Sequence, residues 1–379
     1  MVRTIKNPKN AVVILIVLVI VIYLIDTQTE VLVLEDTSLP VGMKKPGRKK
    51  TYEEFVGAAN MNPNYPIGIA YKQLPDVELP KYLKFKESLL TPVVNQDQCT
   101  SCWAISVVHL VQDRISLYTK GAIKRPLSYQ ELVSCFNNKD DTGCTIGGIP
   151  EAAYKFIAEN GIGTEKDYPY VQARTTKIAK CDPSKQKGFR TFIQKNSIRS
   201  LCIDPDNYKK GSAQWQKTID QNIKNMRTEL FLNGPFTITV MVYQSMYNHD
   251  GLSIYDPPDD KLGEFVGGHS ALCIGMAEEV DGVEPGFDGW YWIIKNSWSS
   301  AWPSKSPASN GYLYIRAGRN CVGVESRAST CQIVITDEIR RNMVDSLDES
   351  RYISYNQYSR DPHRANFVTK ATKLRAMLK

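Results

Sequence analysis

The sequence contains little histidine, and it lacks a second closely spaced pair of cysteines. Its 379 residues include four histidines and nine cysteines, and only Cys99 and Cys102 have Cys-x-x-Cys spacing. A structural zinc site needs four clustered Cys or His ligands, whereas the remaining cysteines are scattered along the chain. The sequence therefore disfavours a zinc site, and we expect no metal and no cofactor.

Dense Lys/Arg stripes with interleaved aromatic residues are also missing, as are internal repeats. The formal net charge of +7 is small for this length, so we expect no nucleic-acid partner. At 42% hydrophobic and 23% charged residues, the composition is that of a globular protein. The length fits one large domain with flanking segments, or two domains.

One long apolar run lies at residues 11–25, with basic residues before it and acidic residues after it. This asymmetry predicts a cytoplasmic segment at 1–10 and translocation of the rest. The run is shorter than a full span of about 20 residues, but no Ala-x-Ala-like cleavage site follows it. We therefore expect a single-pass signal anchor in the membrane, or alternatively a removed signal peptide and a secreted or lysosome-like protein. Both alternatives place the later cysteines in an oxidising compartment, where disulfides form.

The rest of the chain divides into three parts. Residues 26–80 are polar and rich in turn residues, which predicts a stalk or a propeptide; 81–336 have the composition of a folded domain; 337–379 form a polar, basic tail. Helical periodicity comes first in the folded part and strand-like segments follow after about residue 230. This order predicts an α+β fold with a cleft between the halves. The expected helices are 102–118, 129–136 and 149–161, and the expected strands are 235–243, 269–276, 290–298 and 311–317.

Cys102 stands where the first of these helices begins. The unpaired N–H groups of a helix N-terminus stabilise a thiolate and lower the pKa of a cysteine. Cys102 is therefore a candidate nucleophile. Cys99 lies before the helix and is free to serve another purpose.

A nucleophilic cysteine needs a nearby base. His109 follows Cys102 on the same helix but lies about 10.5 Å further along its axis, so it is expected to be a packing residue. His249 in a turn and His363 in the tail are expected to be solvated. His269, in "GGHSALCIGM", remains as the candidate base, although a histidine held inertly inside a strand would show the same pattern.

The segment "WYWIIKNSW" supplies the partners that His269 requires. The amide oxygen of Asn296 can accept a hydrogen bond from one ring nitrogen and fix the tautomer, and Trp298 can shield that bond from water. Gln96, six residues before Cys102, can donate to a developing oxyanion together with the backbone N–H of Cys102. The chain order is Cys, His, Asn.

At these motifs the sequence resembles the papain-like cysteine peptidases, and cathepsin B most of all. The resemblance is carried by "NQDQCTSCWAIS", "GGHSALCIG", "KNSWSSAW" and "CVGVES", and it covers roughly residues 80–332. It implies a two-lobed fold, with a helical left lobe, a β-barrel-like right lobe and the active site in the cleft between them. It also implies a monomeric thiol endopeptidase that acts on polypeptides. The alternative is a catalytically silent papain-fold protein with a binding or structural role in a membrane or a virion. The absence of an Asn-x-Ser/Thr site agrees with a virus-encoded member.

The resemblance also implies how the cysteines are used. It implies that Cys102 stays free and that Cys273 is a buried inert thiol. The expected disulfides are Cys99–Cys144, Cys135 with either Cys181 or Cys202, and a local Cys321–Cys331 bond.

The substrate-binding residues are implied in the same way, with departures from the family pattern. Gly147 and Gly148 would offer backbone to the substrate, but the loop "CTIGG" is one residue longer than usual. Bulkier Asp97 and Thr100 replace glycines. Arg327 would form the floor of the pocket for the P2 side chain and select acidic residues; alternatively it is solvated and bonded to an acid such as Glu325. No pair of histidines occurs between residues 165 and 235, where cathepsin B carries its occluding loop, so the cleft is expected to be open at both ends.

Overall fold

The computed structural model describes residues 79–80, 82–136, 144, 147–171, 179–251, 253–278, 289–303, 310–344 and 351–353. Within these ranges, no helix is both long enough and apolar enough to cross a membrane. The hydrophobic segment predicted at 11–25 and nearly all of the predicted stalk at 26–80 lie outside the described residues. The predicted domain limits therefore stay predictions.

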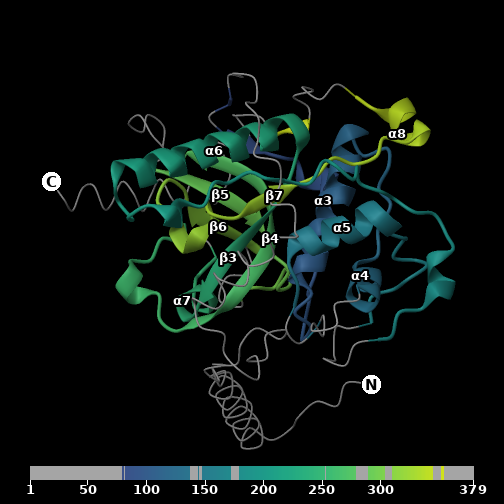
Figure 1. Cartoon of the computed structure of the whole chain (residues 1–379), viewed down its shortest axis with the longest axis horizontal. Helices are drawn as coiled ribbons and strands as arrows, with labels where there is room; N and C mark the ends of the chain where they lie inside the picture. Colours follow the sequence, from purple (N-terminus) through teal and green to yellow (C-terminus); the bar gives the residue numbers. More distant parts are fainter. Residues whose placement is uncertain are drawn as a thin grey trace, which may run out of the picture. The chain divides into compact units, whose positions relative to one another are not determined.

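Helices and strands form two groups (Figure 1). One group contains three helices, α3 (Cys102–Tyr118), α4 (Tyr129–Cys135) and α5 (Pro150–Asn160). The other group is an antiparallel sheet covered by α6 (Ala213–Asn233). The predicted α+β class is confirmed.

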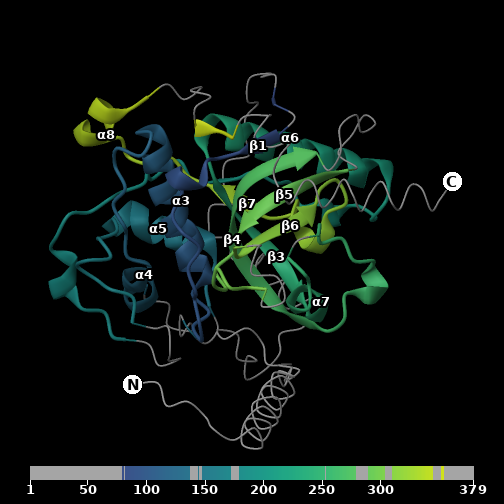
Figure 2. The same ribbon diagram turned by 180° about the vertical axis from the view of Figure 1, so that it is seen from behind.

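The sheet has seven strands among the described residues, in the order β2-β7-β3-β4-β5-β6, with β1 paired to β4. All of the strand pairs are antiparallel. Figure 2 shows from behind how the long β4 crosses the middle of the sheet. The strands are β1 (Tyr82–Lys84), β2 (Arg199–Ser200), β3 (Phe236–Tyr243), β4 (Phe265–Glu278), β5 (Trp290–Lys295), β6 (Tyr312–Arg316) and β7 (Ala328–Thr330).

The helix α3 runs through the interior. Every residue of α3 except Gln112 is buried, as expected for a helix that is apolar on all sides. Its bounds agree with the helix predicted at 102–118. The buried helix thus gives its first residue, Cys102, a fixed position at the boundary between the two groups.

The helix α6 was not expected from the sequence. Its start and end carry ordinary signals: the Ser212 side chain accepts a hydrogen bond from the Trp215 N–H at 3.2 Å, and Gly234 follows the last turn with a φ of 98°. A serine N-cap and a glycine after the C-terminus are typical helix boundaries. Its helical periodicity is hard to recognise in the sequence because polar and charged residues separate the apolar residues of its buried face.

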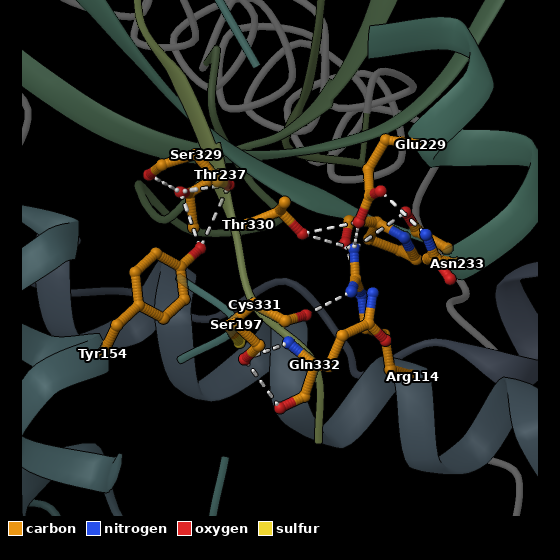
Figure 3. Close-up of polar contacts among 12 residues, drawn as sticks. Arg114, Tyr154, Ser197, Glu229, Asn233, Thr237, Ser329, Thr330, Cys331 and Gln332 are labelled. Atoms are coloured by element: carbon orange, nitrogen blue, oxygen red, sulfur yellow. Dashed lines mark hydrogen bonds and ion pairs between the residues drawn. The ribbon is translucent and has the colours of Figure 1, made fainter. Parts of the chain in front are cut away.

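A buried polar cluster joins α3 to α6 and β7 (Figure 3). The guanidinium of Arg114 donates to Glu229 Oε1 at 2.7 Å and to Thr330 Oγ1 at 2.7 Å, and it also donates to the backbone carbonyl of Pro235 at 2.9 Å. Arg114 is 0% exposed and Glu229 is 1% exposed. Removing one member of a buried ion pair leaves an uncompensated charge at a cost of about 3–5 kcal/mol, so loss of either partner should disturb the contact of α3 with α6 and β7.

The segment predicted as a tail begins with α8 (Asp337–Asn342). Further on, Tyr352 pairs with Phe85 in an isolated antiparallel bridge. The bridge is flanked by hydrogen bonds from the Lys86 N–H to the Arg351 carbonyl and from the Ile353 N–H to the Lys84 carbonyl, each 3.0 Å long. These residues therefore pack against the chain that continues β1.

Candidate active site

Cys102 is the first residue of α3, and its side chain is buried. The backbone N–H groups of Ser270, Trp103 and Cys102 itself act to lower the pKa of the thiol, but burial has the larger effect and raises that pKa. The sequence predicted that the helix N-terminus would lower the thiol pKa overall. That prediction is wrong for the thiol considered alone, because desolvation disfavours the thiolate.

A disulfide holds the turn before Cys102. Cys99 is bonded to Cys144, and the Thr100 N–H donates to the Cys144 carbonyl at 2.9 Å. Asp97 has a φ of 55°, a left-handed conformation that favours glycine, which explains why a glycine is usual at this position.

The remaining cysteine predictions have mixed outcomes. Cys135–Cys181 forms, as one of the two expected alternatives, and Cys273 is a buried free thiol as predicted. The predictions of a Cys135–Cys202 disulfide and of a Cys321–Cys331 disulfide are wrong. Cys202, Cys321 and Cys331 are free thiols.

His269 lies on β4 and reaches Asn296 at the end of β5. The distance from His269 Nε2 to Asn296 Oδ1 is 2.7 Å, and Asn296 Oδ1 also accepts from the Ser297 N–H at 2.8 Å. Because Oδ1 can only accept, Nε2 carries the ring proton. Nδ1 is then left with its lone pair, and this atom is buried without a hydrogen-bond partner among the described residues.

The protonation of His269 is set by its surroundings. Burial lowers its pKa to about 4, while the hydrogen bond to Asn296 acts in the opposite direction. The ring is therefore neutral at physiological pH and able to accept a proton at Nδ1.

One contact between two hydroxyl groups brings the helix and the strand together. Ser106 is one turn after Cys102, Ser270 directly follows His269, and the two Oγ atoms are 2.7 Å apart. Cys102 is also within reach of the Ser270 N–H. The Cys102 thiol and the unpartnered Nδ1 of His269 thus lie at the same junction of α3 and β4.

Trp298 packs on the His269 ring with a centroid separation of 4.6 Å. Its side chain is buried at 4% exposure. It therefore packs over the His269 ring, next to the hydrogen bond between His269 and Asn296.

Gln96 is fully enclosed, with 1% of its surface exposed. Its Oε1 accepts from Ser297 Oγ at 2.7 Å, and its Nε2 donates to the Cys99 carbonyl at 3.0 Å. An amide nitrogen has two N–H groups, so the second N–H can serve another acceptor. The contact with Ser297 fixes which end of the amide is directed toward the Cys99–Cys102 turn.

A comparison with protein families matches residues 79–332 to the description "Papain family cysteine protease". The match covers more than half of the 379 residues. The chain belongs to the papain family of cysteine proteases.

Among curated papain-family proteins, the chain is similar to Cathepsin B-like cysteine proteinase 3 of Caenorhabditis elegans. The two are 30% identical over 241 residues, covering 61% of this chain and 58% of that protein. It is also 30% identical over 253 residues to Cathepsin B-like cysteine proteinase 1 of Ostertagia ostertagi, covering 63% of this chain and 67% of that protein. The chain thus spans 58% of the length of the first of these relatives, and it spans 65% of the length of a further relative, Gut-specific cysteine proteinase of Caenorhabditis elegans.

Solved structures agree on the fold. The proCathepsin B S9 structure from Trypanosoma congolense has a TM-score of 0.54 at 20% identity, over 71% of this chain and 83% of that chain. The procathepsin L 3 structure from Tenebrio molitor has a TM-score of 0.52 at 20% identity, over 74% of this chain and 78% of that chain. The predicted papain-like α+β fold is confirmed.

The two glycines predicted to bind substrate lie beside the start of α3. A Cβ on Gly148 would meet the Trp103 ring at 2.7 Å. Gly147 has a φ of 86°, and a Cβ there would lie 3.2 Å from the Thr100 carbonyl oxygen. Only glycine fits both constraints. The longer loop therefore still places both glycines beside Thr100 and Trp103, at the turn that leads into α3.

Arg327 precedes β7, and its carbonyl accepts from the Thr239 N–H at 2.9 Å. Its charge acts on the carboxyl groups of Glu151 and Asp206 and works against the burial that raises the pKa of each. Glu325 is bonded elsewhere: its Oε1 accepts from Trp292 Nε1 at 2.8 Å. The expectation that Glu325 would bind Arg327 is therefore wrong.

Two of the other histidines can be placed. His109 is buried on α3, as expected of a packing residue. His249 was expected to be solvated, but its side chain is only 11% exposed, and its Nε2 lies 2.9 Å from the Ser253 carbonyl. His363 lies outside the described residues. Within the described ranges, no group of three His, Cys, Asp or Glu side chains is placed to hold a metal ion.

Sequence reasoning missed the serines that connect the site. Ser106, Ser270 and Ser297 each lie close in sequence to a predicted site residue, and this proximity was the available signal. Their roles could not be assigned because each depends on a partner distant in sequence.

Proposed function

We propose that the protein is a thiol endopeptidase in which Cys102 is the nucleophile, His269 is the general base and acid, and Asn296 orients His269. The observation that carries the proposal is the His269 ring, held at Nε2 by Asn296 at 2.7 Å while its buried Nδ1 lacks a partner among the described residues. A ring fixed at one nitrogen and open at the other is suited to accept the proton of a neighbouring thiol.

The first half of the reaction breaks the peptide bond. The Cys102 proton moves to Nδ1 of His269, and the sulfur attacks the carbonyl carbon of the scissile bond. The resulting imidazolium then gives its proton to the amide nitrogen of the leaving group. The C–N bond breaks, the new amine leaves, and the acyl part stays on Cys102 as a thioester.

The second half restores the enzyme. His269 takes a proton from water, and the oxygen of that water attacks the thioester carbonyl. The C–S bond breaks as the proton passes back to the sulfur, and a carboxylic acid is released. The His269 ring needs the same tautomer in both halves of the reaction. Asn296 is proposed to fix that tautomer.

Both halves pass through an oxyanion, for which two donors are proposed. One is the backbone N–H of Cys102 and the other is the second N–H of Gln96. The side chain of Gln96 is already held by Ser297 Oγ and the Cys99 carbonyl, so no reorganisation is required as charge develops.

The acyl part of the substrate is proposed to lie along Gly147 and Gly148, with its P2 side chain near Arg327. Glu151 and Asp206 already interact with the charge of Arg327. Because these two carboxyl groups already interact with the guanidinium, an acidic P2 side chain would add little further stabilisation. A weak preference of the enzyme for acidic P2 residues is therefore proposed. Without a histidine-bearing occluding loop, the cleft is open beyond the scissile bond and supports endopeptidase action.

The catalytic domain is proposed to lie outside the cytoplasm, behind a signal anchor or a removed signal peptide at 11–25. The disulfides Cys99–Cys144 and Cys135–Cys181 support this placement. Residues 26–80 are proposed to keep the protein latent until cleavage near Lys81. N-terminal sequencing before and after activation tests both ideas, and full activity of the uncleaved chain would show that the segment is only a stalk.

Covalent labelling tests the proposed function directly. An epoxide or vinyl-sulfone inhibitor should modify the wild-type protein at Cys102 and stop its hydrolysis of peptides. Cys102→Ser and His269→Ala should each lose hydrolysis, while Cys273→Ser, which removes another buried thiol, should keep it. A folded wild-type protein that is neither labelled nor active would instead be a silent papain-fold binding or structural protein.

A further inference from the structure

Tyr170 lies beside the turn that leads into α3, and contacts with α4 hold it there. Its ring packs against Tyr129, the first residue of α4, with a centroid separation of 4.6 Å. Its backbone N–H donates to Glu165 Oε1 at 2.8 Å, and the N–H of the next residue, Val171, donates to Gln130 Oε1 at 2.8 Å. The position of the phenol is therefore set both by α4 and by the segment that carries it.

The Tyr170 hydroxyl joins two residues of this turn. It donates to the backbone carbonyl of Gln96 at 3.0 Å, and it lies 3.0 Å from Ser101 Oγ. A phenol has one O–H group and a carbonyl oxygen can only accept, so Ser101 donates to the phenol oxygen. Gln96 is 1% exposed and Ser101 is 0% exposed. Both partners of the hydroxyl are thus enclosed.

Each of these two residues is tied to one of the donors proposed for the oxyanion. Gln96 supplies a side-chain N–H. Ser101 shares a planar peptide unit with the backbone N–H of Cys102. The carbonyl of that unit accepts from the N–H groups of Ala104 and Ile105 at 3.0 Å each. Because the N–H of a trans peptide points away from its carbonyl, the Cys102 N–H points away from the body of α3.

The phenol keeps its proton near neutral pH. Burial is the main cause that raises the pKa of Tyr170 to about 12. The nearby charges of Glu165 and Cys102 act in the same direction, and the hydrogen bond with Ser101 opposes them. The effect of the Cys102 charge requires the phenol to lie near the sulfur. The hydroxyl is therefore available as a donor at the place where the proposed chemistry occurs.

We propose that Tyr170 is a positioning residue, whose hydroxyl bridges Gln96 and Ser101 and so fixes the separation of the two oxyanion donors. This inference rests on the proposed peptidase function and deepens it. Tyr170 acts on the rate only through the two donors and does not touch substrate. Donors that are already in place stabilise the charge of the transition state without reorganisation.

Tyr170→Phe keeps the ring against Tyr129 but removes the hydroxyl. It should lower kcat about tenfold and leave KM unchanged, because displaced oxyanion donors bind the transition state less well and the ground state equally well. Affinity for a peptide aldehyde, whose adduct with Cys102 places an oxygen at the oxyanion position, should fall by a similar factor. Alkylation of Cys102 by iodoacetamide, which forms no oxyanion, should keep its wild-type rate.

Tyr168→Phe is the matched control. Tyr168 belongs to the same segment, but its hydroxyl donates to the Lys180 carbonyl at 3.3 Å and accepts from the Asp182 N–H at 3.1 Å. This variant should keep the wild-type kcat, aldehyde affinity and alkylation rate. A general disturbance of the fold in Tyr170→Phe would slow alkylation together with hydrolysis. That result, or a kcat equal to that of the wild type, would overturn the positioning role while the peptidase function stands.

A double variant tests whether Tyr170 acts through the donors. In the Gln96→Ala background one donor is already missing, so Tyr170→Phe should have a smaller effect on kcat than in the wild type. Losses that simply multiply would show that the two residues act independently, against the proposal. A folded wild-type protein that neither hydrolyses peptides nor reacts with a vinyl sulfone at Cys102 would remove the peptidase function, and this inference with it.

Discussion

Ser106 Oγ and Ser270 Oγ lie 2.7 Å apart, buried between α3 and β4. Ser106 is one helical turn from Cys102, and Ser270 is the residue after His269. The contact therefore sets the separation of the two elements that carry the proposed nucleophile and base. Neither serine is expected to touch substrate, so their effect on the reaction is one of position.

Ser106→Ala should lower both stability and activity. It leaves the buried Ser270 hydroxyl without this partner, at a cost of about 1–2 kcal/mol in the free energy of unfolding. We expect kcat/KM to fall roughly tenfold, because a shift of about 1 Å between reacting groups has large kinetic effects. Ser116→Ala is the matched control, since the buried Ser116 Oγ on the same helix has no hydrogen-bond partner among the described residues. Equal behaviour of the two variants would argue against the positioning role.

Gln96→Ala should lower kcat about 10²- to 10³-fold, the range found for the loss of one oxyanion donor. Inhibitors that do not form an oxyanion should still label Cys102 in this variant. Ser297→Ala, which only frees the Gln96 amide to turn, should show a smaller loss. Gln112→Ala, on the far side of α3, serves as the control in the same steady-state assay. If Gln96→Ala turned over at the wild-type rate, Gln96 would have no place in the oxyanion hole.

The pH profile of kcat/KM should have an acid limb near pH 4, because burial lowers the pKa of His269 to about 4. Activity requires the neutral ring, so the rate falls as pH drops through that value. The hydrogen bond that His269 donates to Asn296 raises the His269 pKa, and Asn296→Ala should therefore move the limb to lower pH as well as reducing kcat. A limb that moves to higher pH in this variant would contradict the assigned contact.

Arg327→Ala tests the P2 pocket. A positional-scanning peptide library should show a weak preference for acidic P2 residues in the wild type, since Glu151 and Asp206 already interact with the guanidinium. The variant should lose that preference while keeping its turnover of peptides with an apolar P2 residue. A P2 preference for Leu or Val that is the same in both proteins would exclude Arg327 as a selector.

Glu325 should make folding depend on pH. Burial raises its pKa from 4.5 to about 7, so the folded protein holds a proton that the unfolded chain releases between these values. The stability contributed by this proton is fully present below pH 4.5 and is lost as pH rises through the folded pKa of about 7. The loss amounts to about 3 kcal/mol for this group.

Urea unfolding at several pH values compares the wild type with Glu325→Gln, in which this loss should be absent. Glu159→Gln, at a carboxylate whose side chain is 53% exposed, is the control and should keep the wild-type slope. Parallel stability curves for the wild type and Glu325→Gln would contradict the assignment.

Helices and strands whose signals are local could be predicted from the amino-acid sequence alone. The helix that begins at Cys102 could be recognised because its apolar residues repeat with helical spacing, and β5 could be recognised because aromatic and β-branched residues precede Asn296. The choice of His269 as the candidate base also needed no structure, since the spacing on a helix removed His109. The motifs around these residues were sufficient for the family resemblance that the comparison confirms.

Features that depend on a partner distant in sequence could be assigned only from the folded chain. Folding pairs Cys135 with Cys181, bonds Glu325 to Trp292 instead of Arg327, and leaves the His249 side chain only 11% exposed. Burial also raises the pKa of the Cys102 thiol against the effect of the helix N-terminus. All four have the same cause: periodicity and capping are encoded within a few residues, whereas disulfide pairing, desolvation and buried hydrogen bonding are settled when segments far apart in the chain pack together.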